Sequence, residues 1–295
     1  MRALITGIEG FTGRYVAAEL ERAGYEVCGT CAANRSDPAT PHLIPADLLD
    51  PPALENALAT IRPDVVVHLA AIAFVGHGDA NAFYQTNLIG TRNLLVALVK
   101  TGCRPKNVLL VSSANIYGNA TAGLLDENTP PNPVNDYAVS KLAMEYMASL
   151  WRTQLPIVVA RPFNYTGVGQ SPDFLLPKIV SHFQRRARKI ELGNLDVSRD
   201  FSDVRAVAEA YRRLLEVDVS GQTVNICSGR TIPLRQVIRM VEAIAGYRIK
   251  VNVNPAFVRA DEVHTLGGNP QRLRDLIGDW QSPPLEKTLA WMLGA

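Results

Sequence analysis

Short apolar runs alternate with amphipathic stretches through the first half of the chain. The apolar runs are 2–6, 25–30, 64–70, 107–113 and 156–162, and stretches with helical spacing fill 11–23, 51–60, 80–100 and 134–152. Strands that are apolar at almost every position are buried on both faces, so helices must cover both sides of their sheet. The alternation therefore predicts an α/β fold with a Rossmann-type, doubly wound parallel sheet.

The regular alternation ends near residue 165. The later segments predict a helix over 174–189, a short strand from 190, a helix over 202–216 and a strand over 222–227. We expect a dinucleotide-binding domain made of 1–165, to which 203–227 returns. Residues 166–202 and 228–295 would form a smaller, interleaved C-terminal α/β lobe that binds the substrate.

Composition excludes several classes of protein. The chain of 295 residues is 47% hydrophobic and 20% charged, with a net charge of +2, which argues against a nucleic-acid surface. No apolar run approaches the roughly 18 residues of a membrane span, and the N-terminus has no signal-peptide pattern. Cys28 and Cys31 have CxxC spacing without a second pair, which argues against zinc or another metal. Apolar surroundings of the four cysteines fit a reducing compartment, and we expect a cytoplasmic protein.

A glycine-rich turn, TGIEGFTG, joins the first strand to the first helix. Gly7 permits the tight turn, Gly10 lets a pyrophosphate approach the backbone, and Gly13 allows close packing of helix and strand. The helix that opens with Phe11 and Thr12 would offer its N–H groups to the phosphates. This context favours a dinucleotide site over a merely structural turn.

The choice of dinucleotide depends on the end of the second strand. An NAD site usually has an acidic residue there, but GTCAANRSD has none before Asp37 and offers Arg35 instead. Arg35 could meet a 2′-phosphate, which favours NADP (NADPH) with NAD as an alternative, or be an ordinary loop cation. Asp47, followed by Leu48, is placed to face the adenine ring, although it could equally cap a helix.

Tyr137 and Lys141 are four residues apart in a predicted helix and therefore share one face. A solvated helix face with an incidental aromatic residue competes with a proton donor held beside a cation. Ser113 ends the strand before this helix, at the edge of the sheet where ligands bind in doubly wound folds. A phenol with a pKa near ~10 needs an adjacent cation to exchange protons near neutrality.

The ordered motifs TGIEGFTG, HLAA, SSANIYG and YAVSK resemble those of the extended short-chain dehydrogenases/reductases. The resemblance spans nearly the whole chain and implies that Ser113, Tyr137 and Lys141 are catalytic. By the family's pattern, Lys141 also bonds the nicotinamide ribose, Ser113 donates to the substrate oxygen and Tyr137 protonates it. The HLAA motif adds cofactor contacts from Leu69, Ala70 and Ala71.

Later motifs resemble the nucleotide-sugar branch of these enzymes, and most closely its GDP-4-keto-6-deoxy-D-mannose reductases. These motifs are ARPFNYTGVGQ (160–170) and ELGNLDVSRDFSDVRAVAEAY (191–211). The resemblance implies that Asn164 lies against the substrate diphosphate and that Arg199 and Arg259 clamp its phosphates, with Lys178 as a possible addition. Each basic residue could instead make a surface salt bridge, and Asn164 could cap a loop.

Asn115 favours a reductase over a 4,6-dehydratase. Dehydratases carry acids after the catalytic Ser or Thr, whereas SSANIYG has Asn115, whose carboxamide cannot exchange protons near neutral pH. We therefore expect NAD(P)H-dependent reduction of the C4 ketone of GDP-4-keto-6-deoxy-D-mannose to GDP-D-rhamnose. The related fucose-forming enzymes also epimerise with a Cys, and Cys103 precedes its strand at the wrong end for this.

Other functions on the same fold remain open. A nucleotide-sugar 4-epimerase would usually keep the missing acid after the second strand. A redox-sensing regulator would typically lose the Tyr/Lys pair, which this chain keeps. In the family, helices corresponding to 80–100 and 134–152 commonly pair with those of a second subunit, so we expect a homodimer.

Overall fold

Seven parallel strands form the main sheet of the computed structural model, which describes residues 1–31, 43–76, 78–120, 123–258 and 263–295. The strand order is β10-β6-β5-β4-β1-β2-β3. The strands are β1 (Arg2–Thr6), β2 (Glu26–Cys31), β3 (Leu43–Pro45), β4 (Val65–His68), β5 (Asn107–Val111), β6 (Ile157–Pro162) and β10 (Thr223–Ile226). The predicted Rossmann-type sheet is confirmed.

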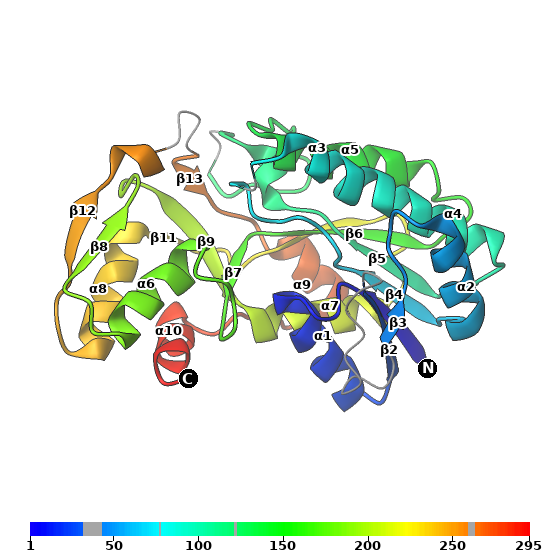
Figure 1. Ribbon diagram of the computed structural model, residues 1–295, viewed down its shortest axis with the longest axis horizontal. Helices are drawn as coiled ribbons and strands as arrows, with labels where there is room; N and C mark the ends of the chain where they lie inside the picture. Colours follow the sequence, from blue (N-terminus) through cyan, green and yellow to red (C-terminus); the bar gives the residue numbers. More distant parts are fainter. Residues whose placement is uncertain (32–42, 77, 121–122, 259–262) are drawn as a thin grey trace.

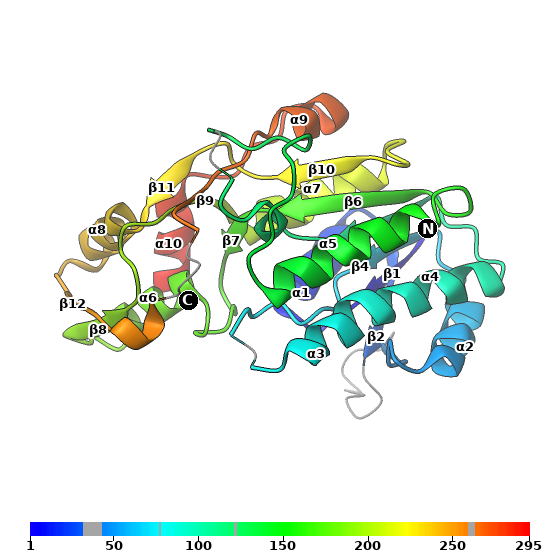
Figure 2. The same ribbon diagram turned by 90° about the horizontal axis from the view of Figure 1, so that it is seen from above.

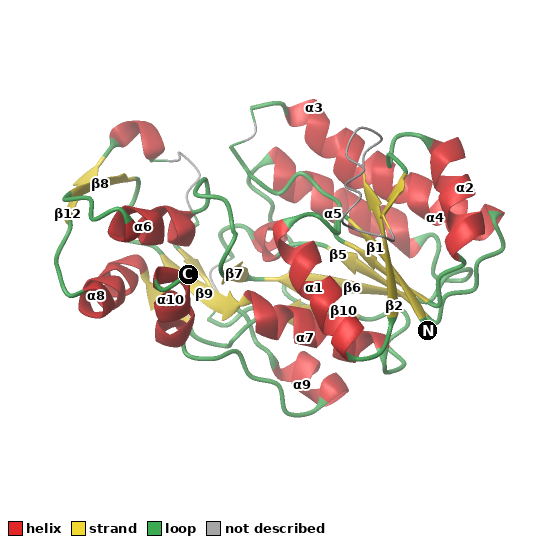
Figure 3. Ribbon diagram, turned by 60° about the horizontal axis from the view of Figure 1, so that its bottom comes forward, coloured by secondary structure: helices red, strands yellow, loops and turns green. Residues whose placement is uncertain are grey.

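Helices cover both faces of this sheet (Figures 2 and 3). One face carries α1 (Phe11–Arg22), α7 (Val204–Leu215) and α9 (Gln271–Ile277), and the other carries α2 (Pro51–Ile61), α4 (Thr91–Lys100) and α5 (Asp136–Ser149). The strand order reverses between β1 and β4, and doubly wound folds bind ligands at the carboxyl ends of the strands at such a point.

A second, smaller lobe lies beside the sheet (Figure 1). Its strands are β7 (Asn164–Thr166), β8 (Lys189–Leu192), β9 (Ser198–Asp203), β11 (Thr231–Pro233), β12 (Lys250–Val253) and β13 (Thr265–Leu266). Its helices are α6 (Leu175–Gln184), α8 (Leu234–Ala245) and α10 (Leu285–Leu293), with a 3₁₀ turn at Pro255–Phe257. The three helices share one apolar core with β8 and β9.

Three predicted helices differ from the observed ones. The stretch 80–100 contains α3 (Ala80–Phe83), a π-helical segment (Tyr84–Gly90) and α4. The helix predicted over 174–189 ends at Gln184, because Arg186 takes a left-handed φ of 54° and the chain turns into β8. The helix predicted from 202 begins at Val204, since Ser202 and Asp203 still belong to β9.

The stretch 271–280 packs against the main sheet, although the sequence placed it in the second lobe. Leu273, Ile277 and Trp280 are buried in the same core as α1 and α7, and the Trp280 indole donates a 2.9 Å hydrogen bond to the carbonyl of Ala206. The domain boundaries otherwise stay a prediction.

Within the described ranges, no helix is long and apolar enough to cross a bilayer.

Candidate active site

The glycine turn lies where the strand order reverses, with almost no space for side chains. Gly7 has a φ of +72°, and a Cβ added to it would lie 2.8 Å from the backbone nitrogen of Ala70. A Cβ on Gly13 would lie 2.3 Å from the carbonyl oxygen of Gly7, and one on Gly10 would lie 3.1 Å from the same oxygen. Only glycine fits Gly7 and Gly13 without moving backbone, so the turn can present its N–H groups to a ligand.

The start of α1 is open to an anion. Gly10 caps the helix without a side-chain hydrogen bond, and its first turn has no acidic residue. The Phe11 ring stacks on Tyr165 of β7 at 6.1 Å between centroids, and the Thr12 hydroxyl lies 2.8 Å from the Tyr165 hydroxyl. A pyrophosphate fits this cradle, because the helix dipole and free N–H groups favour negative charge.

The segment after β4 closes the cradle. The backbone N–H groups of Leu69 and Ala70 donate to the carbonyl and hydroxyl oxygens of Thr6, each at 3.2 Å. His68 is buried, with its ring nitrogens 2.7 Å from the Thr6 hydroxyl and 2.8 Å from that of Thr91. Burial lowers the pKa of His68 to about 3, so its imidazole is neutral. Ala71, which follows Ala70, is partly buried.

Ser113, Tyr137 and Lys141 come together at the carboxyl end of β5. Asn135 caps α5 by accepting from the Ala138 N–H at 2.9 Å, which places Tyr137 in the first turn. The Ser113 hydroxyl interacts with the Tyr137 phenol and lowers its pKa. The Lys141 amino group donates to the Val111 carbonyl at 2.8 Å. All three side chains are buried.

Burial dominates the titration of this group. It raises the pKa of Tyr137 to about 12, and Ser113 opposes that rise. It lowers the pKa of Lys141 to about 8, against which Glu145 raises it. We expected Lys141 to lower the pKa of Tyr137, whereas in this structure the Lys141 amino group donates to Val111 and the lowering comes from Ser113.

Asn115 lies at the start of a 3₁₀ turn (Ala114–Tyr117) that Ser113 caps. Its backbone N–H donates to the Ser113 hydroxyl at 3.1 Å, and its side chain is partly exposed. A neutral carboxamide therefore occupies the position next to Ser113 where the dehydratase pattern has an acid.

Three of the predicted substrate residues, Asn164, Lys178 and Arg199, lie on the second lobe. Asn164 is exposed on β7, which pairs with β9, the strand that carries Arg199. The Arg199 guanidinium donates to the carbonyls of Ser198 and His264 at 3.0 and 3.1 Å. The Lys178 amino group lies 4.3 Å from the centroid of the Phe257 ring, a cation–π contact.

Four further residues were predicted to bind the cofactor or the substrate: Arg35, Arg259, Asp47 and Leu48. Arg35 and Arg259 lie outside the described residues. Asp47 is exposed and accepts from the Leu49 N–H at 2.8 Å, and Leu48 is buried. The helix cap considered for Asp47 is supplied by Asp50, which accepts from Ala53.

Sequence reasoning missed a polar layer behind the site. Asn87, in the π-helical segment, bonds both backbone groups of Ile72 and the Ser140 hydroxyl. Glu145 and Arg161 form a buried ion pair with 2.6 Å between Oε2 and Nη2. Each residue had a signal of its own, because Glu145 follows Lys141 by four residues and Arg161 interrupts an apolar strand, but no signal indicated that the two would pair.

A glycine turn at the point where a doubly wound sheet reverses its strand order defines a dinucleotide-binding α/β protein. The NAD dependent epimerase/dehydratase family model matches residues 3–227, and the chain belongs to this family of extended short-chain dehydrogenases/reductases. It is thus a member of a family of enzymes that bind NAD(P).

Two curated relatives cover nearly the whole chain. GDP-6-deoxy-D-talose 4-dehydrogenase of Aggregatibacter actinomycetemcomitans is 36% identical over 95% of this chain and 92% of its own length. GDP-6-deoxy-D-mannose reductase of Pseudomonas aeruginosa is 35% identical over 94% of this chain and 91% of its own length.

Solved structures agree with this placement. A putative epimerase from Burkholderia cenocepacia J2315 is 55% identical, with a TM-score of 0.94 over 99% of this chain and 97% of that one. RMD from Pseudomonas aeruginosa complexed with NADPH is 32% identical, with a TM-score of 0.87 over 99% of this chain and 98% of that one.

Proposed function

We propose that the chain is an NADPH-dependent reductase that converts GDP-4-keto-6-deoxy-D-mannose to GDP-D-rhamnose. The observation that carries the proposal is the burial of Ser113, Tyr137 and Lys141 together at the carboxyl end of β5, with the neutral Asn115 two residues after Ser113. Reduction of a ketone needs one proton donor and one oxyanion partner, and both are present. Elimination of water would also need a base at the position of Asn115.

The residues would act as follows. Bound NADPH supplies the hydride. Ser113 donates a hydrogen bond to the ketone oxygen, and Tyr137 gives up its phenolic proton to that oxygen as negative charge develops. Lys141 binds the nicotinamide ribose and stabilises the phenolate that Tyr137 leaves behind.

The cofactor would lie along the carboxyl edge of the sheet. The turn of Gly7, Gly10 and Gly13 would hold the pyrophosphate, with Phe11 and Thr12 at the helix start. Leu69, Ala70 and Ala71 would contact the cofactor, and Asp47 and Leu48 the adenine end. The NADPH preference is supported by the missing acid after β2 and by the NADPH complex of RMD.

The second lobe would hold the GDP moiety. Asn164 and Arg199 are on paired strands and would bind the diphosphate, with Arg259 as a second guanidinium. Lys178 already contacts Phe257, so we give it a lesser part in this clamp.

Two related reactions compete on specific grounds. GDP-6-deoxy-D-talose differs from GDP-D-rhamnose only at C4, and the relative that acts on it is as similar as the reductase. Hydride delivery to the other face of the same ketone would give the talose epimer. A nucleotide-sugar 4-epimerase is the third candidate and would hold its cofactor tightly through purification.

One assay separates these functions. GDP-4-keto-6-deoxy-D-mannose and NADPH are mixed with the protein, and the absorbance of the reduced cofactor is followed. We expect stoichiometric oxidation of NADPH and a product whose C4 configuration, read by proton NMR, is that of rhamnose. A talose configuration would redirect the assignment to the epimeric reduction. A flat trace with this ketone would refute the reductase altogether. Repeating the assay with NADH and with Arg35→Ala tests the cofactor preference.

A further inference from the structure

The end of β5 and the two residues that follow it lie against one face of α5. The Val111 carbonyl accepts from Lys141 at 2.8 Å, and the Ser112 hydroxyl donates to Glu145 at 2.5 Å. The next residue, Ser113, interacts with the Tyr137 phenol and lowers its pKa. Positions 137, 141 and 145 are successive i, i+4 neighbours on one face of the helix. Of these three helix residues, Glu145 is the one with no part in the proposed chemistry.

Glu145 is held from two directions. Its Oε1 accepts from the Ser112 hydroxyl and from Arg161 Nε at 3.0 Å, and its Oε2 accepts from Arg161 Nη2 at 2.6 Å. Both side chains of the ion pair are 9% exposed. A buried carboxylate with this many donors is fixed in position, because losing any of them would strand a desolvated charge.

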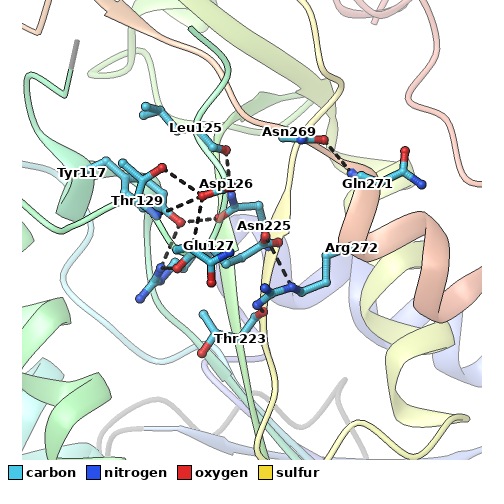
Figure 4. A network of polar contacts seen from close by, with 12 residues as sticks. Tyr117, Leu125, Asp126, Glu127, Thr129, Thr223, Asn225, Asn269, Gln271 and Arg272 are labelled. Atoms are coloured by element: carbon cyan, nitrogen blue, oxygen red, sulfur yellow. Dashed lines mark hydrogen bonds and ion pairs between the residues drawn. The ribbon is translucent and has the colours of Figure 1, made fainter. Parts of the chain in front are cut away.

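Arg161 is itself anchored by a second set of polar contacts, and Figure 4 shows Tyr117, Asn225, Glu127 and Arg272 of that network. Its Nη1 donates to the Tyr117 hydroxyl at 2.9 Å, and that hydroxyl donates to Asn225 Oδ1 at 2.8 Å. Glu127 accepts from the Asn225 N–H at 2.8 Å and pairs with Arg272 at 3.5 Å. The network thus ties Glu145 to β6, β10 and α9, so the carboxylate cannot swing toward solvent.

The charge of Glu145 faces Lys141 from the next turn of α5. Burial disfavours the ammonium, and Glu145 is the group that raises the pKa of Lys141 against burial. His68 on β4, which interacts with Lys141, has a lowered pKa and is neutral, and Tyr137 on α5 has a raised pKa. On the elements that pack against α5, Tyr117 of the 3₁₀ turn accepts from Arg161, Tyr84 donates to Asp136, and Arg92 of α4 is exposed. Removing the carboxylate would leave the ammonium without a compensating charge.

We propose that Glu145 is a positioning residue of this active site: it holds Ser113 in register with Tyr137 through Ser112, and it keeps Lys141 in its charged form. The proposal rests on the proposed roles of these three residues. A purely structural ion pair would affect folding, but it would not change the pH at which Lys141 loses its proton.

The test compares Glu145→Gln with Ser112→Ala. Glu145→Gln removes the charge and keeps the shape, so the basic limb of the kcat profile should move down by about 1 pH unit. Ser112→Ala keeps the charge of Glu145 and removes its hydrogen bond with Ser112. We therefore expect kcat to fall by roughly tenfold while the basic limb of the pH profile stays where it is. Glu55→Gln, which removes a surface ion pair with Lys100, is the matched control and should change neither.

Two further measurements keep the test decisive. If Glu145→Gln does not fold because Arg161 is left unpaired, the Glu145→Gln/Arg161→Met double variant removes both charges and should still move the limb downward. The dissociation constant of NADPH against pH, read by cofactor fluorescence, reports the titration of Lys141 without substrate. The proposal is wrong if a folded Glu145 variant keeps the basic limb of the wild type, either in the pH profile of kcat or in the pH dependence of NADPH binding. The wild type could instead fail to reduce the ketone while the Glu145 variant still shifts the pH dependence of NADPH binding. That result would refute the proposed function and leave the role of Glu145 standing.

Discussion

The amino group of Lys141 donates its 2.8 Å hydrogen bond to the carbonyl oxygen of Val111, the last residue of β5. A helix side chain is thus fastened to the end of a strand whose next residues are Ser112 and Ser113. The ammonium is held one helical turn from Tyr137 by the protein alone. The site is therefore preorganised, which reduces the cost of assembling it when ligands bind.

Replacement of Lys141 should weaken both cofactor binding and turnover. Lys141→Met keeps most of the packing and removes the charge, so we expect a higher dissociation constant for NADPH and a kcat lowered by about 10²-fold or more. In the wild type, the pKa of about 8 predicts that activity falls as pH rises through 8. A cofactor titration together with a pH profile measures both effects. Unchanged NADPH affinity would contradict the ribose contact.

Replacement of Tyr137 should affect turnover alone. Tyr137→Phe keeps the buried ring and removes the hydroxyl, so kcat should fall by about 10²–10⁴-fold while NADPH affinity stays near wild type. Tyr146→Phe is the control, because Tyr146 is on the same helix and 66% exposed. Steady-state kinetics decide the question. Nearly wild-type activity of Tyr137→Phe would assign the ring a packing role only.

The third glycine of the turn should not tolerate a methyl group. Gly13→Ala places a Cβ 2.3 Å from the Gly7 carbonyl, so helix and strand must move apart and the pyrophosphate cradle is distorted. We expect at least a tenfold loss of NADPH affinity, read by fluorescence titration. Gly294→Ala is the control, since its Cβ would lie 3.6 Å from its nearest neighbour. Equal affinities of the two variants would argue against the cradle.

The exposed face of α5 should be a subunit interface. Val139, Tyr146 and Leu150 are 38%, 66% and 75% exposed and follow one another along one side of the helix. We expect twice the chain mass of 32.2 kDa in light scattering, and a monomer for Leu150→Arg. Ile244→Arg, on α8 at 40% exposure, should stay dimeric. A wild-type monomer at micromolar concentration would refute the dimer.

The buried imidazole of His68 should make stability depend on pH. Its pKa is about 3 in the folded protein and near ~6.5 when unfolded. The unfolded state therefore binds the proton first, and stability falls as pH drops below 6.5, by about 2 kcal/mol at pH 5. Urea unfolding at pH 7 and pH 5 measures this loss.

The control for this prediction is a second histidine. His68→Asn should flatten the loss between pH 7 and pH 5, whereas His264→Asn, at an exposed position, should keep it. Equal slopes for the two variants would show that His68 titrates normally.

The sequence predicted the sheet well because its strands are apolar throughout and the helices between them are amphipathic. It also predicted that Ser113, Tyr137 and Lys141 meet, since strand ends and the i, i+4 spacing follow local rules. It could not predict the π-helical segment or the end of α6, because these depend on the buried contacts of Asn87 and the left-handed φ of Arg186.

The Glu145–Arg161 pair was missed for a different reason. Charged residues in a helix and in a strand give no sign of which of them will meet, because the pairing depends on which elements pack together. The same holds for 271–280: its apolar residues are compatible with either core, and only the fold shows that Trp280 reaches Ala206 of α7.

The path of the chain has a consequence for how this protein can change. After β7 and β9 it returns to the sheet through α7 and β10, goes back to the second lobe with β11 and α8, and revisits the sheet with α9 before ending in α10. No single cut in the gene separates the two parts. Exchanging the second lobe would therefore need several joints in the chain, whereas a change of substrate specificity by single substitutions needs none.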